Sequence, residues 1–373
     1  MRSGAGSSHA CIIACMPDAV PHAVIIGSGS EISGHRITND AMARIMDTSD
    51  AWIRERTGVE ARYFVEPGTS TTDLAVPAAR RALEAAQIDP SAIDLVVFAT
   101  MTPDHFFPGN GGLLQSRLGL RPIPCFDIRQ QCSGFLYGLQ LADAHIRAGM
   151  ARMALLVGAE VHSGFMPWSE GGWARLAGDA DAPLAEGEWE RNSAVRHLAV
   201  LFGDGAAAVV VSAQASSARG VIDHELAADG TNADKLWVPG VGFRHRPYVD
   251  ADMIARGEAM PTMDGRYVFK MASTKMAEAA HAILQRNGFG VDDLSMVLMH
   301  QANRRINEFV QKMLRIPDDK VAHNIERYGN TTAATIPLLW DECVRGGRIS
   351  SGDLVLMVGF GAGMTWGASL LRA

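Results

Sequence analysis

A cysteine at the start of an expected helix is the first residue that could do chemistry. Cys132 lies in the segment DIRQQCSGF (127–135), after a short apolar strand pattern and before a long apolar helix pattern. A thiol at a helix N-terminus faces the positive end of the helix dipole, which favours the nucleophilic thiolate. Taken alone, however, Cys132 is better interpreted as an inert core thiol, because free cysteines are often simply buried.

Two polar residues in the second half of the chain also follow expected strands. His300 comes directly after the apolar run Met296–Met299, so its ring should project from a strand end. Asn330 lies in YGNTTAA (328–334), at another strand-to-helix junction. Each has a structural alternative, because the histidine could be a core residue and the asparagine could be a helix cap or a left-handed turn residue.

The elements that must position these residues alternate between strand and helix. Short apolar runs predict buried strands, and apolar residues at helical spacing predict amphipathic helices. In the first half we expect strands at Ala23–Ile26, Leu95–Ala99, Cys125–Ile128, Leu155–Gly158 and Ala206–Ser212. Helices are expected between them at Thr72–Ala86, Gly111–Leu118 and Gly134–Ala148.

The second half repeats this order of elements. In chain order its expected strands are Met296–Met299, Val321–Ile325, Leu354–Val358 and Ala368–Leu371. The repetition predicts an internal duplication, with two similar α/β halves packed together. The junctions at Cys132 and Asn330 would then be equivalent to within about one residue. Cys132, His300 and Asn330 would all lie at strand ends where the halves face each other, which is where α/β sheets place their sites.

The chain divides into an extension and two halves. Residues 1–21 are rich in Ser, Gly and Ala and have no signal-peptide layout, so we expect a disordered extension. The Cys132 half spans 22–216, and the half with His300 and Asn330 spans 217–373. Residues 162–200 contain three tryptophans and several acidic residues with little periodicity, which predicts a long loop or lid inserted in the first half.

Composition excludes several function classes. The 373 residues carry a formal net charge of −7, and no apolar run is long enough to span a membrane. Nucleic-acid and membrane binding are therefore not expected, and the cytoplasm is the expected location. The five cysteines are widely spaced and odd in number, which argues against a disulfide framework or a zinc site. Gly27-Ser28-Gly29 lacks the further glycine of a dinucleotide-binding loop.

From about Ala23 to Ala373 the sequence resembles the ketoacyl-[acyl-carrier-protein] synthase III family of the thiolase fold. The matching stretches are TSDAWI (48–53), RTGV (56–59), FP (107–108), the Cys132 segment, FGDGA (202–206), GRYVFK (265–270), HQAN (300–303), GNT (329–331) and 360–367. The resemblance implies duplicated α/β halves with five-stranded mixed sheets in a layered α-β-α-β-α arrangement. It also implies a homodimer, and no metal, flavin or nicotinamide cofactor.

The resemblance assigns a reaction to these residues. Cys132 would take an acyl group from a coenzyme A (CoA) thioester, with the backbone N–H groups of Cys132 and Ala362 as the oxyanion hole. His300 and Asn330 would hydrogen-bond the thioester carbonyl of malonyl-acyl carrier protein as it loses CO₂. The carbanion would attack acyl-Cys132 and give a 3-ketoacyl product. Thiolases have a second cysteine in the turn at 360–364, which this sequence lacks, and elongating synthases have a histidine in place of Asn330.

The resemblance also implies a set of binding residues. Trp52 and Arg56, together with Thr48, would contact the adenine and phosphates of CoA through a flat ring and a guanidinium fork, although Trp52 could instead anchor a surface helix. Phe107 would lie at the floor of the partner subunit's acyl tunnel, and Asn303 would support His300 or the pantetheine arm. The remaining expected binding residues are Gly265, Arg305 and Phe360. Four basic residues could dock the acidic carrier protein or form a solvated helix face: Arg304, Arg305, Lys312 and Arg315.

Three features depart from an acetyl-primed enzyme. Gln131 stands before the nucleophile where the family has a small residue, Met364 stands where an aromatic is usual, and segment 162–200 is long. They suggest a different or larger acyl donor, which could be medium-chain, branched or a natural-product intermediate. A second hypothesis is acyl transfer to an oxygen or nitrogen nucleophile in secondary metabolism. A non-catalytic partner subunit is a third, and the intact set of Cys132, His300 and Asn330 argues against it.

Overall fold

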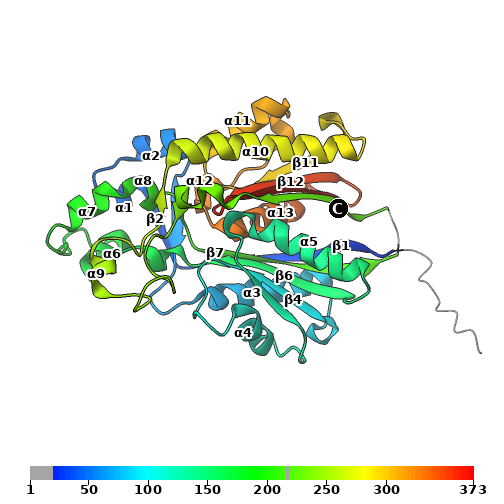
Figure 1. Ribbon diagram of the computed structural model, residues 1–373, viewed down its shortest axis with the longest axis horizontal. Coiled ribbons are helices and arrows are strands. Elements are labelled where there is room, and N and C mark those ends of the chain that lie inside the picture. The colour runs from blue at the N-terminus through cyan, green and yellow to red at the C-terminus, as the bar shows by residue number, and fades with distance from the viewer. Residues whose placement is uncertain (1–19, 216–217) are drawn as a thin grey trace, which may run out of the picture.

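Two mixed β-sheets with helices outside and between them form the protein (Figure 1). The computed structural model describes residues 20–215 and 218–373, so the expected extension 1–21 lies almost entirely outside the described residues. The first sheet has the strand order β1-β7-β6-β4-β5 and the second has the order β11-β12-β13-β8. Their strands are β1 His22–Glu31, β4 Leu95–Ala99, β5 Cys125–Ile128, β6 Met153–Glu160, β7 Gly205–Gln214, β8 Gly220–Ala228, β11 Met296–Met299, β12 Leu354–Gly361 and β13 Thr365–Arg372.

The two sheets repeat one pattern of neighbours. In the first, β4 and β6 are parallel, and β6-β7 and β7-β1 are antiparallel. In the second, β11 and β12 are parallel, and β12-β13 and β13-β8 are antiparallel. The expected duplication is therefore confirmed by strand order and direction.

The second sheet differs from the expectation at one edge. β5 pairs with β4 over Cys125–Ile128, but the corresponding segment Val321–Ile325 makes a single bridge, from Val321 to Val297. Ile325 already begins the short helix α12 (Ile325–Tyr328). The prediction of a fifth strand in this sheet is therefore wrong. The segment has only four residues before the helix begins at Ile325, and it forms one bridge instead of a row of strand hydrogen bonds.

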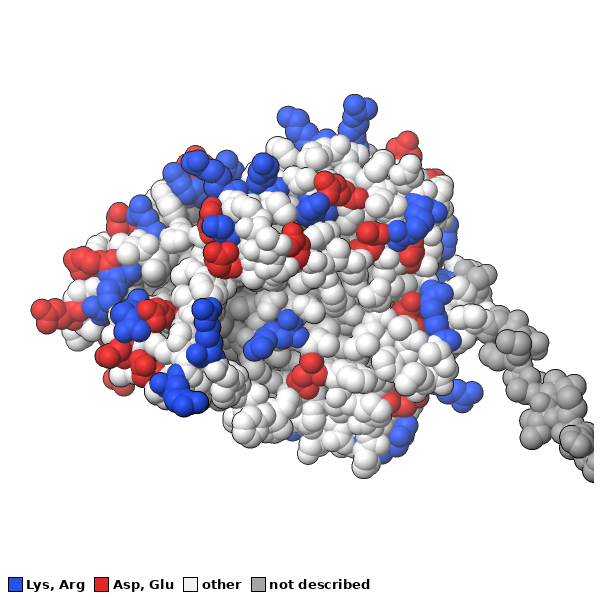
Figure 2. Space-filling model, in the orientation of Figure 1, with Lys and Arg blue, Asp and Glu red and all other residues white. Residues whose placement is uncertain are grey.

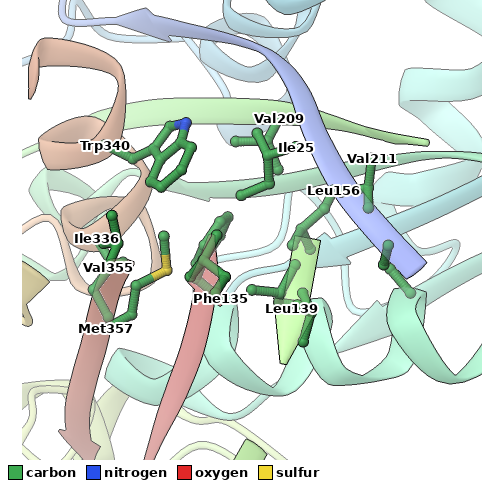
Figure 3. Close-up of a cluster of buried hydrophobic side chains, with 14 of the residues drawn as sticks. Ile25, Phe135, Leu139, Leu156, Val209, Val211, Ile336, Trp340, Val355 and Met357 are labelled. Atoms are coloured by element: carbon green, nitrogen blue, oxygen red, sulfur yellow. The ribbon is translucent and has the colours of Figure 1, made fainter. Parts of the chain in front are cut away.

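Two helices fill the space between the sheets. α5 (Gly134–Arg147) and α13 (Thr335–Arg345) bury their apolar faces in one core with residues of both sheets. Figure 3 shows Phe135 and Leu139 of α5 and Trp340 of α13 pointing into this core, with Val209 of the first sheet and Met357 of the second. Outside the sheets, α3 (Thr71–Ala86) and α4 (Asn110–Arg117) cover the first, and α10 (Gly265–Arg286) and α11 (Arg304–Leu314) cover the second. The layers follow the expected α-β-α-β-α order.

Gly27 and Gly29 allow helix α3 to pack closely against strand β1. A Cβ on Gly27 would lie 2.5 Å from backbone atoms of Ala82 and Ala86 in α3, and one on Gly29 would lie 2.5 Å from those of Ala78 and Ala82. Both glycines are in β1, so the close approach of α3 to the sheet requires them. The rejection of a dinucleotide loop agrees with this position.

Residues 162–200 are mostly helical, so the prediction of an irregular loop is wrong. They form α6 (Glu170–Ala177), α7 (Glu188–Ala194) and α8 (Arg196–Ala199) after the 3-10 turn η3 (His162–Phe165). The helices are too short to produce clear periodicity, which is why the sequence pattern missed them. Trp168 and Trp173 pack edge-on against Phe64, both with ring centroids 5.7 Å away.

The remaining elements lie at the edges of this frame. They are β2 His35–Thr38, α1 Asn39–Met42, α2 Asp50–Thr57, β3 Ala61–Phe64, β9 Leu236–Trp237, α9 Ala251–Ala255 and β10 Thr262–Met263. Among the helices of residues 20–215 and 218–373, none has the length and apolar character needed to cross a bilayer.

Candidate active site

One large cavity brings the three predicted catalytic residues together. It has a volume of ≈ 870 Å³, and Cys132, His300 and Asn330 all line it. Arg56 and Arg129 also line it, whereas no Asp or Glu is among the described lining residues. The cavity lining is therefore largely apolar, and Cys132, His300 and Asn330 are among its few polar residues.

Cys132 lies in a 3-10 turn, η2 (Gln131–Ser133), between β5 and α5. Gln131 has a φ of 45°, in the left-handed region that residues with side chains seldom adopt, and this conformation directs the chain sharply from strand into helix. Gly361, at the end of β12, closes the other side. A Cβ there would lie 3.1 Å from the backbone nitrogens of Cys132 and Ser133, so a side chain at 361 would crowd the turn; the Ser133 N–H already donates to the Gln130 carbonyl.

The thiol of Cys132 is protonated at rest, contrary to the expectation from the helix dipole. Burial, together with the charge of Glu160, raises the pKa of Cys132 to about 12. Its own backbone N–H and the Asn330 amide act in the opposite direction, but they are the smaller effects. Since only 9% of the Cys132 residue is exposed, removing water from the thiolate outweighs the favourable dipoles.

His300 follows β11, as predicted, and lies almost fully buried in the cavity wall. Its Nδ1 lies 2.7 Å from the Thr335 hydroxyl, which is also 3.0 Å from the Thr332 carbonyl oxygen. That hydroxyl donates its single proton to the Thr332 carbonyl, so in this arrangement the Nδ1–H of the neutral ring donates to the hydroxyl oxygen. Nε2 has no partner among the described residues, and it carries the ring proton only when the hydroxyl turns its own proton to Nδ1. Burial lowers the pKa of His300 to about 3, so the ring is neutral and a poor proton acceptor.

Asn330 is held by backbone contacts to the Phe202–Gly205 turn. Its N–H donates to the Leu201 carbonyl at 2.8 Å, and the Gly203 N–H donates to the Asn330 carbonyl at 3.1 Å. The side-chain oxygen accepts from the Thr332 N–H at 2.8 Å. This contact fixes the amide, so its NH₂ group is the donor that acts on Cys132 and lowers the pKa of the thiol.

The junctions at Cys132 and Asn330 are related less closely than expected. The second junction also contains a 3-10 turn, η7 (Thr332–Ala334), and Thr332 has a φ of 41°, as Gln131 has 45°. Aligning these two left-handed residues places Ala333, not Asn330, opposite Cys132. The prediction of equivalence to within one residue is therefore wrong, and Asn330 reaches the cavity from ahead of its turn.

The expected CoA-binding residues are partly assembled at the cavity mouth. Trp52, Arg56, Gly265, Asn303 and Phe360 line the cavity. The guanidinium of Arg56 lies 4.7 Å from the centre of the Trp52 ring, and the side-chain NH₂ of Asn303 donates to the Arg56 carbonyl at 2.9 Å. Asn303 thus links the start of α11 to α2.

Four other residues singled out from the sequence do not line the cavity. Thr48 precedes α2, and Arg305 is exposed on α11. Met364 is in the core outside the second sheet, so its departure from the family pattern does not act on the cavity directly. Phe107 is 81% exposed, and its predicted place in a partner's tunnel stays a prediction.

Comparison with known proteins now adds to this geometry. The family model for 3-oxoacyl-[acyl-carrier-protein] synthase III matches residues 126–184 and 188–230, and the model for its C-terminal part matches 284–373. The chain belongs to the 3-oxoacyl-[acyl-carrier-protein] synthase III family. It is therefore an enzyme of the acyltransferase class with the thiolase fold.

Relatives of the synthase III family match along nearly the whole chain. A β-ketoacyl-[acyl-carrier-protein] synthase III of Rhizorhabdus wittichii is 39% identical over 94% of this chain and 99% of its own length. The crystal structure of the 3-oxoacyl-[acyl-carrier-protein] synthase III of Aquifex aeolicus has a TM-score of 0.79 and 34% identity, covering 94% of this chain and 100% of that one. The priming β-ketosynthase of the R1128 polyketide pathway has a TM-score of 0.80 and 30% identity, covering 96% and 98%.

The synthase III family acts through a catalytic cysteine without a metal or cofactor. Residues 20–215 and 218–373 contain no cluster of His, Cys, Asp and Glu that could hold a metal ion. Cys125, Cys132 and Cys343 are free thiols.

Several residues of this synthase III cavity were missed in the sequence. Arg196 places its guanidinium 4.9 Å from the Trp52 ring centre, and its neighbour His197 lines the cavity. Phe106, rather than Phe107, lines the cavity of its own chain. A whole wall comes from residues 233–263, including Trp237 and Met263. These residues have no motif or periodicity, and only their apolar character could have pointed to a binding wall.

Proposed function

We propose that the protein joins an acyl group carried on Cys132 to a malonyl unit carried by acyl carrier protein, with loss of CO₂. The observation that carries this proposal is that Cys132, His300 and Asn330 all line one cavity. The names of the relatives support it, since they are β-ketoacyl-[acyl-carrier-protein] synthases III. The 3-ketoacyl thioester and CO₂ are the products.

The first half-reaction loads the cysteine. The sulfur of Cys132 attacks the thioester carbonyl of acyl-CoA, and a tetrahedral oxyanion forms before CoA leaves. The backbone N–H groups of Cys132 and Ala362 are the proposed donors to that oxyanion. Their support is the close approach of Gly361 to the Cys132 nitrogen.

The second half-reaction generates and uses an enolate. As the malonyl group loses CO₂, negative charge develops on its thioester oxygen, and that oxygen needs hydrogen-bond donors. The proposed donors are the NH₂ group of Asn330 and the Nε2–H of neutral His300, which forms when the Thr335 hydroxyl donates to Nδ1 instead of to the Thr332 carbonyl. The low pKa of His300 supports this role, because burial keeps the ring neutral. The enolate carbon then attacks acyl-Cys132 and releases the cysteine as thiolate.

The proposed binding path runs from the surface to the thiol. Trp52, Arg56 and Arg196 would hold the adenine and phosphates of CoA by stacking and charge. Figure 2 shows Lys and Arg side chains gathered along the upper edge of the molecule, over the region of α2 and α11. We propose the exposed residues of α11, Arg305 and Lys312 among them, as the docking surface for the acidic carrier protein. Charge reversal at Arg305 should raise the KM for the carrier-protein substrate and leave Cys132 loading from acyl-CoA unchanged.

The proposed acyl donor is larger than acetyl. Gln131, Phe165 and His197 line the cavity, and two of these belong to segment 162–200. Intact-mass spectrometry of Cys132 after exposure to acetyl-, medium-chain, branched and aromatic acyl-CoAs tests this proposal. Preferential acetylation would overturn it.

We also propose a homodimer, for which two exposed aromatic residues give support. Phe107 is 81% exposed, and Phe126 is 39% exposed on β5, an edge strand of the first sheet. A paired second copy would cover both. Sedimentation at micromolar concentration should give a mass near twice 40.0 kDa, and a mass near 40.0 kDa would contradict the proposal. The cytoplasmic location stays a prediction.

Release of CO₂ decides between condensation and simple acyl transfer. Condensation consumes malonyl thioester and releases one CO₂ for each acyl group that leaves Cys132. Transfer to an oxygen or nitrogen nucleophile discharges the cysteine without CO₂. Labelled malonyl-carrier protein therefore tests the proposal directly, and discharge of acyl-Cys132 without labelled CO₂ would favour the acyltransferase alternative.

A further inference from the structure

One arginine of the cavity has no role in the reaction described above. Arg56 and Arg129 both line the cavity. The guanidinium of Arg56 is engaged at the mouth, 4.7 Å from the centre of the Trp52 ring and 3.4 Å from a carboxylate oxygen of Glu55. The side chain of Arg129, by contrast, forms no hydrogen bond or ion pair with any of residues 20–215 and 218–373. It is a cation without a partner of opposite charge.

Arg129 belongs to the part of the lining that carries the thiol. The residues of the mouth come from α2, α8 and the start of α11. Arg129 instead follows β5 directly, and the Thr100 N–H donates to the Ile128 carbonyl at 3.2 Å, so the chain leaves the sheet beside the loop after β4. Phe106 of that loop also lines the cavity. Because Arg129 precedes Cys132 by three residues, their Cα atoms are at most about 11 Å apart.

Acidic side chains on the neighbouring elements are engaged elsewhere. Asp127 of β5 accepts from the backbone N–H of Gly111 at 3.1 Å. Glu160 of β6 accepts from the Thr102 hydroxyl at 2.6 Å. Neither of them lines the cavity or forms an ion pair with Arg129. A counter-ion for this arginine must therefore come from outside the described part of the chain.

A second polar group of the same segment also faces the cavity without a partner. Gln131 lines the cavity, and its Oε1 would lie 4.0 Å from a Cβ on Gly363, a residue of the turn after β12 that lines the cavity as well. The side-chain amide of Gln131 forms no hydrogen bond with the described residues. The amide and the guanidinium of Arg129 are thus both available to a ligand near the thiol.

A bound acyl group makes the missing partner of Arg129 important. The arginine is exposed, so water can hydrate it. A substrate that occupies the cavity displaces this water, and most of the surrounding lining is apolar. A cation that loses its water without gaining a hydrogen-bond acceptor is destabilised. An entirely apolar acyl group would leave Arg129 in that state, whereas an acyl group with an anionic end would not.

A carboxylate is the ligand group that fits these donors best. A guanidinium carries five N–H donors in a flat fork and no acceptor, and the fork matches the two oxygens of a carboxylate. No Asp or Glu is among the described lining residues, so the carboxylate has to belong to a substrate. Two substrates could supply it: the far end of the acyl group on Cys132, or the malonyl unit.

The chemistry of decarboxylation favours the acyl group as the source. The malonyl carboxylate passes its charge to the developing enolate as CO₂ leaves. A cation bound to it would stabilise the substrate more than the transition state and would slow this step. A carboxylate at the far end of the acyl group keeps its charge throughout, so Arg129 can orient that group without opposing the reaction.

We propose that Arg129, together with the amide of Gln131, binds a carboxylate at the far end of the acyl group and makes the enzyme selective for short ω-carboxyacyl-CoA donors. This inference rests on the acyl-Cys132 of the proposed function and names the class of acyl group that loads it. The chain between thioester and carboxylate is short because Arg129 is so close to Cys132 in the sequence. Arg129 binds substrate here and takes no part in bond breaking.

Matched pairs of acyl-CoAs test this selectivity. Succinyl-CoA and butyryl-CoA have acyl groups of the same length that differ in the terminal carboxylate, and glutaryl-CoA and pentanoyl-CoA form a second pair. Single-turnover loading of Cys132 is measured by rapid quench and intact-mass spectrometry. It should be about 10- to 100-fold more efficient for the carboxyacyl member of each pair, the range expected for hydrogen bonds between charged groups. Equal or better loading of the uncharged member would overturn the proposal.

Replacements of Arg129 assign the selectivity to this residue. Arg129→Met removes the charge and keeps most of the length, and Arg129→Lys keeps the charge without the fork. We expect the methionine variant to lose the preference for succinyl-CoA while it loads butyryl-CoA at least as well as wild type, and the lysine variant to retain part of the preference. Arg121→Met, which removes an exposed arginine outside the cavity lining, is the matched control and should keep the wild-type preference. A methionine variant that still preferred succinyl-CoA would refute the role of Arg129.

Condensation from a butyryl group tests the other source of a carboxylate. Butyryl-Cys132 carries no carboxylate, so Arg129→Met should show the wild-type KM for malonyl-carrier protein and the wild-type release of CO₂. A raised KM with an unchanged ratio of succinyl to butyryl loading would assign Arg129 to the malonyl carboxylate and overturn the proposal. A weaker dimer in sedimentation, again with an unchanged loading ratio, would assign Arg129 to an acid of the second copy and would also overturn it.

The outcomes separate this inference from the proposed function. If Cys132 takes up no acyl group from any of the four CoA thioesters, the proposed function falls together with the inference. If butyryl-CoA loads Cys132 and succinyl-CoA loads it no better, only the class of acyl donor falls. Thermal unfolding of each variant shows whether it is folded, and the comparison of matched acyl-CoAs on the wild type needs no variant.

Discussion

The turns that lead into α5 and α13 share one backbone design and carry different chemistry. Each is a 3-10 turn whose first residue has a left-handed φ, 45° for Gln131 and 41° for Thr332, and each runs directly into a helix of the central layer. The second residue is Cys132 in one turn and Ala333 in the other. Duplication therefore preserved the turn, while the reactive groups diverged within it.

The small side chain of Ala333 is what lets the two turns meet. Its Cβ and carbonyl lie against positions where Gly134 and Gly158 have no side chain. A larger residue at 333 would push η7 away from the thiol and take Asn330 out of the cavity. The turn η2 thus supplies the nucleophile. The small residue Ala333 in η7 allows the two turns to pack closely, so that Asn330 and Thr332 line the same cavity as Cys132.

The largest effect is expected when the thiol of Cys132, the reactive group of the first turn, is removed. Cys132→Ala should reduce acyl loading by on the order of 10⁴-fold or more, because no other cysteine of residues 20–215 and 218–373 lines the cavity. Intact-mass spectrometry after incubation with acyl-CoA measures it. Cys125→Ala, which removes a free thiol on β5, should load normally. Substantial loading of Cys132→Ala would break the assignment of chemistry to this turn.

The second-largest effect is expected from replacing Asn330, which lies just before the other turn, η7. Asn330→Ala should leave the loading of Cys132 within a few-fold of wild type and reduce condensation by about 10²- to 10³-fold, since one donor to the enolate oxygen is lost. His300→Ala should show the same split. The measurement compares acyl-enzyme formation with CO₂ release from malonyl thioester. If either variant lost loading and condensation equally, the assignment of loading to Cys132 and of condensation to His300 and Asn330 would be contradicted.

A smaller effect is expected from the glycine that faces the first turn. Gly361→Ala places a Cβ 3.1 Å from the nitrogens of Cys132 and Ser133, so these N–H groups must shift. We expect loading to slow by about 10-fold, as displaced oxyanion donors would cause. Gly112→Ala in α4, which meets nothing within 4 Å, is the matched control. Unchanged loading in Gly361→Ala would contradict the assignment of the Cys132 N–H to the oxyanion hole.

The smallest expected effect is on the way in which the free energy of unfolding changes with pH. The pKa of His300 is about 3 in the folded chain and 6.5 for a free histidine, so the unfolded chain binds more protons below pH 6.5. Stability is therefore lost as pH falls from 6.5 towards 3. Between pH 6.5 and 5, wild type should lose about 2 kcal/mol more than His300→Ala in denaturant unfolding. The other buried histidines are present in both chains, and identical pH slopes would contradict a neutral, buried His300.

Strands with continuous apolar runs were predicted well. Leu95–Ala99 and Met296–Met299 have the expected bounds, because a strand buried on both faces needs apolar residues at every position. Cys125–Ile128 also has the expected bounds, but it is an edge strand with Phe126 and Asp127 exposed, so the prediction that it is buried was wrong. Val321–Ile325 looks similar in sequence, yet pairing depends on a neighbouring strand and on where the chain turns next. The helices in 162–200 and the cavity wall at 233–263 were missed because short helices and irregular walls leave no period.

The sequence by itself determined which groups can react, and the tertiary structure decided their state. The order and type of Cys132, His300 and Asn330 are covalent facts, and their position after strands predicted that they would meet. The raised pKa of the thiol, the neutral His300 and the buried Glu160 are not readable in the chain. They depend on how much water is excluded and on which charges come near, and both are set by residues far apart in sequence.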